Sequence, residues 1–101
     1  MVIYTEQNFF NDAIFLSNII DKDKYTCIYP IPKGGIALGV ILSERLSLPI
    51  ITKNNIDAKT LIVDDLVDSG ATRQKFAEND FACIHIKSHT PQICCRHIIS
   101  T

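Results

Sequence analysis

The chain has 101 residues and 47% of them are apolar, which is enough for the core of one small domain spanning residues 1–101. Its formal net charge is −1, so it lacks the basic field that attracts nucleic acid, and we expect no nucleic-acid partner. No apolar run has the length needed to cross a membrane, and the first residues lack the pattern of a secretory signal peptide. We therefore expect a cytoplasmic protein with no membrane partner.

Hydrophobic spacing predicts strands and helices that alternate along the chain. After a short extended start at residues 2–4, apolar side chains recur at helical spacing from Phe9 to Ile20. The rest of the pattern predicts strands at residues 25–31, 49–52, 60–64 and 81–86, helices at residues 36–46 and 71–79, a loop at 88–92 and an edge strand at 98–99.

This alternation indicates an α/β fold with a parallel, doubly wound sheet and helices on both faces. Ligands of such sheets bind beyond the carboxyl ends of the strands. The turn Lys33-Gly34-Gly35 follows the first predicted buried strand, and the acids that begin at Asp64 follow the central one. We therefore expect both segments to face one cleft.

The segment from Leu61 to Thr72 carries the clearest chemical signal. An apolar strand ends in Asp64 and Asp65, and Asp68 then opens a Ser-Gly-Ala-Thr turn. Carboxylates this close repel one another, so such a cluster usually holds a metal, a sugar diol or a proton. Small residues at a helix start also offer backbone N–H groups to a phosphate. Together these features suggest a phosphorylated sugar with a divalent cation.

This segment resembles the binding loop for 5-phosphoribosyl-1-pyrophosphate in type I phosphoribosyltransferases, with Ser69 in place of the usual threonine. The resemblance implies that Asp64 and Asp65 bind the ribose hydroxyls, directly or through Mg²⁺, and that Asp68 is the general base facing the nucleobase. It also implies a cradle for the 5′-phosphate formed by Ser69, Gly70, Ala71 and Thr72.

Two further features resemble the purine branch of this family, which contains the xanthine–guanine and hypoxanthine enzymes. Lys33-Gly34-Gly35 matches the pyrophosphate-binding turn, where a non-proline cis peptide often precedes the basic residue; here that bond would be Pro32–Lys33. Lys87 follows the predicted strand at residues 81–86, at the position where family members bind the exocyclic oxygen of a 6-oxopurine.

The resemblance implies an enzyme of purine salvage. It would transfer a phosphoribosyl group from phosphoribosyl pyrophosphate to a nucleobase, most specifically a 6-oxopurine, and release pyrophosphate. The implied cofactor is Mg²⁺, and the implied assembly is a homodimer or a higher homo-oligomer.

Two parts of the family pattern are missing. Only residues 54–59 occupy the place of a long flexible loop, and the sequence ends at Thr101 without a C-terminal hood. A partner subunit that completes the site, an open base pocket or a trimmed relative would each account for this. The alternative function is a non-catalytic regulatory module of the same fold that binds phosphoribosyl pyrophosphate or a nucleotide.

The four cysteines suggest a reducing compartment. Cys27 and Cys83 lie within apolar runs, as small core residues do. Cys94 and Cys95 are adjacent, and neighbouring cysteines rarely form a disulfide. A zinc site built from these two residues and His97 would lack further ligands nearby, so we favour reduced thiols.

Overall fold

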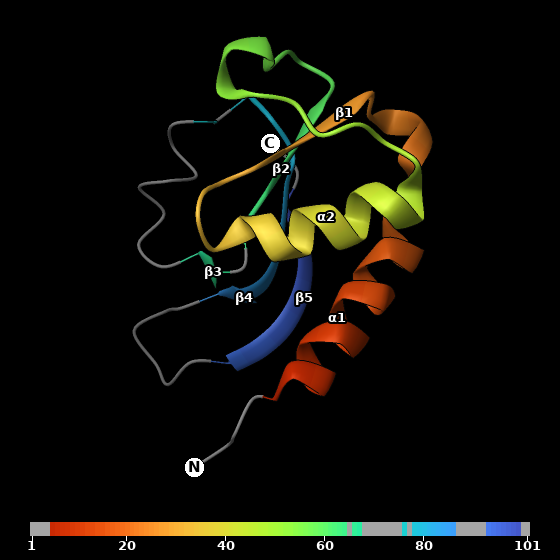
Figure 1. The fold of residues 1–101 in the computed structure, drawn as a ribbon, viewed down its shortest axis with the longest axis vertical. Coiled ribbons are helices and arrows are strands. Elements are labelled where there is room, and N and C mark those ends of the chain that lie inside the picture. Colours follow the sequence, from red (N-terminus) through yellow and green to blue (C-terminus); the bar gives the residue numbers. More distant parts are fainter. Residues whose placement is uncertain (1–4, 65, 68–75, 77, 87–92, 100–101) are drawn as a thin grey trace.

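The computed structural model describes residues 5–64, 66–67, 76, 78–86 and 93–99 (Figure 1). Its helices are α1 (Glu6–Ile19) and α2 (Gly35–Leu46), with two short 3₁₀ turns, η1 (Lys22–Lys24) and η2 (Lys53–Asn55). Its strands are β1 (Cys27–Pro30), β2 (Thr60–Val63), β3 (Leu66–Val67), β4 (Phe81–Ile86) and β5 (Ile93–Ile99). None of the described helices has the length and apolarity that a membrane span requires.

The strands form one mixed sheet with a parallel centre. β1, β2 and β4 are parallel neighbours, and β5 pairs antiparallel with β4. Ile62 lies opposite Phe81 and Leu66 lies opposite His85, so β2 and β3 follow β4 with the same register offset. Because β5 pairs along β4 from Phe81 to Ile86, β2 and β3 share the other edge of β4.

Helix α1 begins at a capping box. Thr5 Oγ1 accepts a hydrogen bond from the Asn8 backbone N–H at 3.1 Å, and Asn8 Oδ1 accepts one from the Thr5 backbone N–H at 3.0 Å. These bonds satisfy N–H groups that a helix start leaves without partners. Helix α1 then buries Ala13 and Leu16, as the predicted helical spacing requires.

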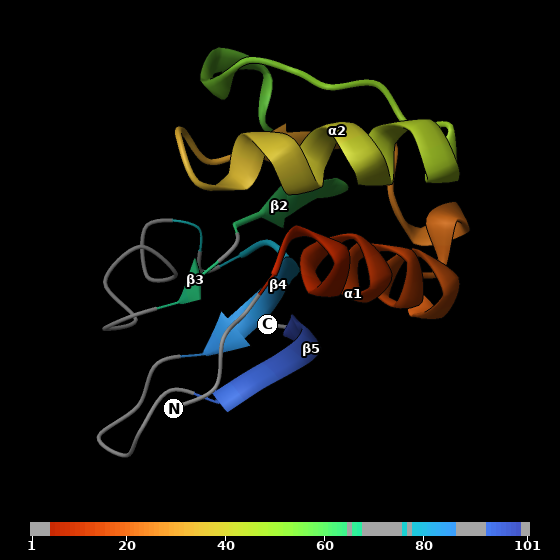
Figure 2. The same ribbon diagram turned by 60° about the horizontal axis from the view of Figure 1, so that its bottom comes forward.

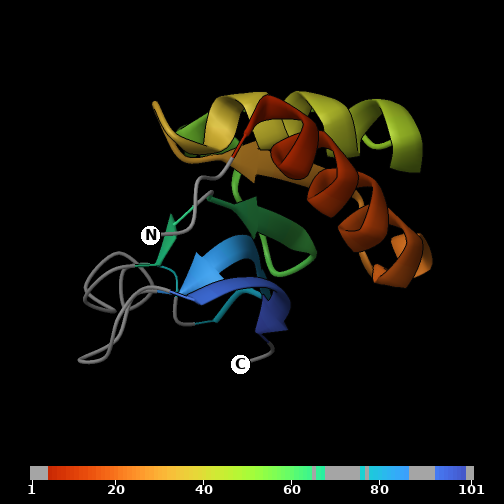
Figure 3. The same ribbon diagram turned by 90° about the horizontal axis from the view of Figure 1, so that it is seen from below.

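Both helices cover the same face of the sheet (Figures 2 and 3). Successive side chains of a strand point to opposite faces, so β2 serves two clusters of buried residues. Leu61 and Val63 pack with residues of α1 and α2 in the larger cluster. On the second face, Ile62 packs with Phe81 and Cys83, against the partly buried side chains of Tyr29, Ile31, Ile56 and Phe76.

The predicted α/β class and its parallel centre are confirmed, with differences at the edges. Helices were predicted on both faces, whereas the described helices α1 and α2 cover one face. The strand predicted at residues 49–52 is a single parallel bridge between Ile50 and Ile28. β5 begins at Ile93 rather than at residue 98, and it is antiparallel. The helix predicted at residues 71–79 lies mostly outside the described residues, and its described part consists of turn and bend. The predicted extended start at 2–4 and loop at 88–92 also lie outside them.

A buried tyrosine links the segments that precede β1 and β4. The Tyr25 hydroxyl donates a hydrogen bond to Asp80 Oδ2 at 2.6 Å, and Lys24 Nζ lies 3.6 Å from the same oxygen. Burial, followed by the hydrogen bond and charge of Asp80, raises the pKa of Tyr25 above its ordinary value of 10.0.

We predict that this tyrosine makes stability fall at alkaline pH. Above the ordinary tyrosine pKa, the unfolded chain loses the Tyr25 proton while the folded chain keeps it, so the free energy of unfolding decreases as pH rises. Tyr25→Phe should cost about 1 kcal/mol near neutral pH and should make this decrease shallower. Urea unfolding of both proteins between about pH 8 and about pH 11 measures the effect, and parallel pH profiles would contradict it.

Candidate functional site

The Lys33 turn joins β1 to α2 at the carboxyl end of β1. The peptide bond between Pro32 and Lys33 is cis, as predicted. Lys33 and Gly34 are exposed, and Gly34 occupies the N-cap position of α2 without a capping side chain. Within the described part of the chain, Lys33 forms no salt bridge. Its exposed ammonium group is therefore open to an anionic ligand.

Backbone contacts hold this turn against the exit of β2. The Ile31 N–H donates to the Val63 carbonyl oxygen at 2.8 Å, and the Gly35 N–H donates to the Ile31 carbonyl oxygen at 2.8 Å. A Cβ atom on Gly35 would collide with the Val63 carbonyl oxygen and lie 3.1 Å from Asp64 Cα. Only glycine permits this approach without displacing the backbone. The turn and the first acid of the predicted cluster are therefore neighbours, as the sequence predicts.

Asp64 is half-buried directly after β2. Its backbone N–H donates to the Ala82 carbonyl oxygen of β4 at 3.1 Å, which fixes the strand exit between β1 and β4. A carboxylate is the kind of hard oxygen ligand that Mg²⁺ takes, either directly or through water. Asp64 therefore suits the role that the sequence assigns to it, although no group of three or more metal-ligating side chains occurs among the described residues.

The remaining predicted site residues lie outside the described part of the chain. They are the second acid of the pair, the predicted general base with its phosphate cradle, and the lysine that follows β4: Asp65, Asp68, Ser69, Gly70, Ala71, Thr72 and Lys87. Their roles stay predictions.

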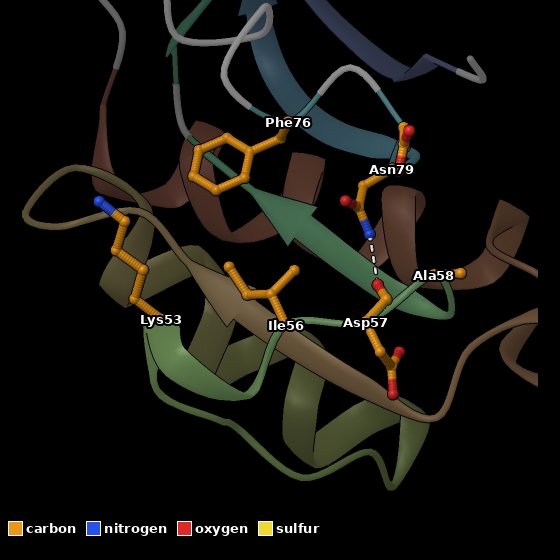
Figure 4. Close-up of a pocket in the computed structure, with 7 residues that line it drawn as sticks. Lys53, Ile56, Asp57, Ala58, Phe76 and Asn79 are labelled. Carbon is orange, nitrogen blue, oxygen red and sulfur yellow. Dashed lines mark hydrogen bonds between the residues drawn. The ribbon is translucent and has the colours of Figure 1, made fainter.

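A hollow of about 380 Å³ lies on the second face of the sheet, and the sequence did not suggest it (Figure 4). It lies between the link from η2 to β2 (residues 56–59) and the segment before β4. Its lining comprises Lys53, Ile56, Asp57, Ala58, Phe76, Glu78 and Asn79. Neither the Lys33 turn nor Asp64 contributes to this lining.

One signal in the sequence could have marked the hollow. Residues 53–59 form a mostly polar link, but Ile56 is apolar and packs against the cluster on the second face. An apolar residue in a polar connection often covers part of a core, so Ile56 could have indicated that this link touches the sheet.

The sequence matches no protein-family model and no curated protein. Two solved structures resemble the fold over most of its length. A purine phosphoribosyltransferase from Pyrococcus horikoshii Ot3 gives a TM-score of 0.74 at 21% identity, covering 99% of this chain and 87% of that one. A xanthine-guanine-hypoxanthine phosphoribosyltransferase from Helicobacter pylori gives 0.61 at 19% identity, covering 90% of this chain and 80% of that one.

The likeness to these structures agrees with the parallel centre of the sheet. The chain therefore has the α/β fold of the purine phosphoribosyltransferases, which is the type I phosphoribosyltransferase fold predicted from its sequence.

Proposed function

We propose that the chain transfers a phosphoribosyl group from phosphoribosyl pyrophosphate to a 6-oxopurine and releases pyrophosphate. The observation that carries the proposal is the contact of Gly35 with the backbone of Val63 and Asp64. This contact brings a basic, glycine-rich turn against an acidic strand exit, in a fold shared with purine phosphoribosyltransferases. A cation beside a carboxylate suits a substrate that has both an anionic leaving group and sugar hydroxyls.

The reaction breaks the bond between C1′ and the pyrophosphate oxygen and forms a bond between C1′ and a ring nitrogen of the base. Lys33 and the backbone N–H groups of its turn stabilise the charge that develops on the departing pyrophosphate. Asp64 accepts hydrogen bonds from the ribose hydroxyls. When bound, Mg²⁺ neutralises the negative charge of the pyrophosphate.

The other roles follow the predicted motif. Asp68 takes the proton that the base nitrogen loses as the new bond forms. The Ser69–Thr72 turn holds the 5′-phosphate, Asp65 supports the ribose beside Asp64, and Lys87 selects a 6-oxopurine by donating to its exocyclic oxygen. The chain would work in purine salvage in the cytoplasm.

Homo-oligomerisation is part of this proposal because large apolar side chains are exposed on both helices and beside the sheet. Each of them has between 42% and 48% of its surface exposed: Phe10, Phe15, Ile19, Ile36, Val40 and Ile50. A second copy of the chain would cover such side chains.

The alternative is a module that binds phosphoribosyl pyrophosphate or a nucleotide without catalysis. The link between η2 and β2 favours it. Ile56 packs this link onto the sheet, and the Asp57 N–H donates to Thr60 Oγ1 at 2.9 Å. A link held in this way does not close over a bound donor to exclude water, as a flexible lid would.

We predict transfer of the phosphoribosyl group to guanine, xanthine or hypoxanthine in the presence of Mg²⁺, and no transfer after chelation of the metal. Asp68→Asn should lower kcat by about 10²- to 10⁴-fold, because the amide cannot accept the proton of the base. Chromatography of the nucleotide product across these bases, adenine, uracil and orotate measures the activity.

Asp23→Asn is the matched control, since it neutralises an exposed carboxylate in η1, before β1 and away from the strand exits. It should leave the rate unchanged. Absence of product with every base would refute the transferase proposal, and retained binding of phosphoribosyl pyrophosphate would then support the binding module.

We predict that Gly35→Ala weakens donor binding, whereas Gly39→Ala only destabilises the fold. Both added methyl groups meet a neighbour, since a Cβ on Gly39 would lie 2.6 Å from Pro30 Cβ and one on Gly35 would meet the exit of β2. Each variant should lose about 1–3 kcal/mol in free energy of unfolding. Only Gly35→Ala displaces the turn from Asp64, so only it should weaken binding, by about tenfold or more.

Calorimetric titration with phosphoribosyl pyrophosphate and Mg²⁺, at a temperature where both variants are folded, measures the difference. Equal losses of affinity in the two variants would mean that general destabilisation, rather than the position of the turn, controls binding.

A further inference from the structure

The hollow on the second face of the sheet has a buried hydrogen-bond acceptor at one end. Asn79 is only 7% exposed, and its Nδ2 donates to the carbonyl oxygens of Asp57 at 2.7 Å and Thr60 at 3.0 Å. Only the nitrogen of a carboxamide can donate, so these two bonds fix which way the group points. Oδ1 therefore faces away from both carbonyls, into the space between Phe76 and Ile56 (Figure 4).

This oxygen accepts no hydrogen bond from any residue that the structure describes. An acceptor that faces a hollow can be reached by water or by a ligand. A ligand that brings an N–H group into the hollow would hydrogen-bond to this oxygen in place of water. The Asn79 end of the hollow therefore favours a molecule that presents a ring or amino N–H group to Oδ1.

The walls of the hollow suit a planar ring. The Phe76 ring lies on one side and the Ile56 side chain on the other (Figure 4). Phe76 is itself supported from the sheet by Tyr29, with 5.8 Å between the ring centroids. Aromatic rings stack favourably on nucleobases and hold them without regard to sequence. The volume of about 380 Å³ also lies within the range of roughly 300–1,000 Å³ that small-molecule sites occupy.

The charges on the rim are separated along the hollow. Ile50 pairs in parallel with Ile28 of β1, so Lys53, three residues further on, lies towards the carboxyl end of that strand. Asp57 and Ala58 lie at the other end, immediately before β2. Figure 4 shows the Lys53 side chain on the Phe76 side of the hollow and the Asp57 carboxylate turned away from it. Glu78 is a second acidic residue of the lining, so an anionic group is favoured beside Lys53 and disfavoured beside Glu78.

We propose that this hollow binds a mononucleotide. Its base would lie between Phe76 and Ile56 and donate an N–H to Asn79 Oδ1, and its phosphate would lie against the Lys53 ammonium group. Among the described residues, the hollow has none in common with the Lys33 turn and Asp64, so we treat it as a second site. A mononucleotide is also the product class of the proposed transferase, but binding in the hollow does not require catalysis.

Amide chemical shifts in a ¹⁵N-labelled sample test the proposal, because they locate the ligand as well as detect it. Guanosine and adenosine monophosphate should give saturable shifts at Ile56, Ala58 and Asn79. Ribose 5-phosphate, which lacks the base, should leave the Asn79 amide unchanged. The same titrations on Asp68→Asn separate this proposal from the proposed transferase, since that variant should keep the shifts at Asn79 even without any activity.

Two variants examine the contacts. Ala58→Trp fills the hollow from an exposed position and should weaken binding by about tenfold or more. Lys53→Gln should weaken mononucleotide binding by about three- to tenfold but leave guanosine binding unchanged. Lys22→Gln, which changes an exposed lysine in η1 outside the hollow, is the control and should have no effect.

Shifts confined to the Lys33 turn and Asp64 would place the nucleotide at the proposed active site alone and overturn the proposal. It would equally be overturned if no saturable shift appeared at Asn79, or if Lys22→Gln and Lys53→Gln weakened binding to the same extent.

Discussion

The close approach of Gly35 to the exit of β2 is the constraint on which the candidate site depends. Pro30 and Val63 are register partners, so β1 and β2 end at the same level. The residue after β1, Ile31, donates its N–H to the Val63 carbonyl oxygen. Helix α2 begins with a glycine because a side chain there would collide with the end of β2. The turn that carries Lys33 is thereby fixed against Asp64, and no ligand is needed to assemble this part of the site.

Side-chain hydrogen bonds reinforce the amino edge of the sheet, beside backbone bonds such as Thr26 N–H to the Lys59 carbonyl oxygen. Asn79 bridges the carbonyls that flank the start of β2, and Tyr25 donates to Asp80 just before β4. Hydrogen bonds at the start of neighbouring strands fix their register, and the register stays the same up to their carboxyl ends. Both β2 and β3 pair with β4 in this one register, Ile62 with Phe81 and Leu66 with His85. The polar bonds at one edge therefore help to align the residues that meet at the other.

The sequence was sufficient for features that depend on local pattern. Apolar spacing predicted both described α-helices and the parallel centre. The cis bond before Lys33 was implied by the resemblance of the Lys-Gly-Gly segment to the family's pyrophosphate-binding turn. It was insufficient where distant groups decide. The Asn79 amide is oriented by carbonyls 22 and 19 residues away, and nothing in its neighbours distinguishes it from a solvated residue. β5 was underestimated because Arg96 and His97 interrupt its apolar run. The acids and cradle from Asp65 to Thr72 remain predictions.

The link between η2 and β2 bears on both proposals, because it occupies the place of the family's flexible loop in the first site and forms a wall of the second. Ile56 and the Asp57–Thr60 hydrogen bond hold it down, and contacts of this size contribute about 1–3 kcal/mol together. That amount is small enough for a bound ligand to shift the balance between a form in which the link is packed on the sheet, here called lowered, and one in which it is released from the sheet, here called lifted. A nucleotide that stacks on Ile56 and binds Lys53 would favour the lowered form. Any donor that needs the link lifted would then bind more weakly, so the two ligands would oppose each other through this segment.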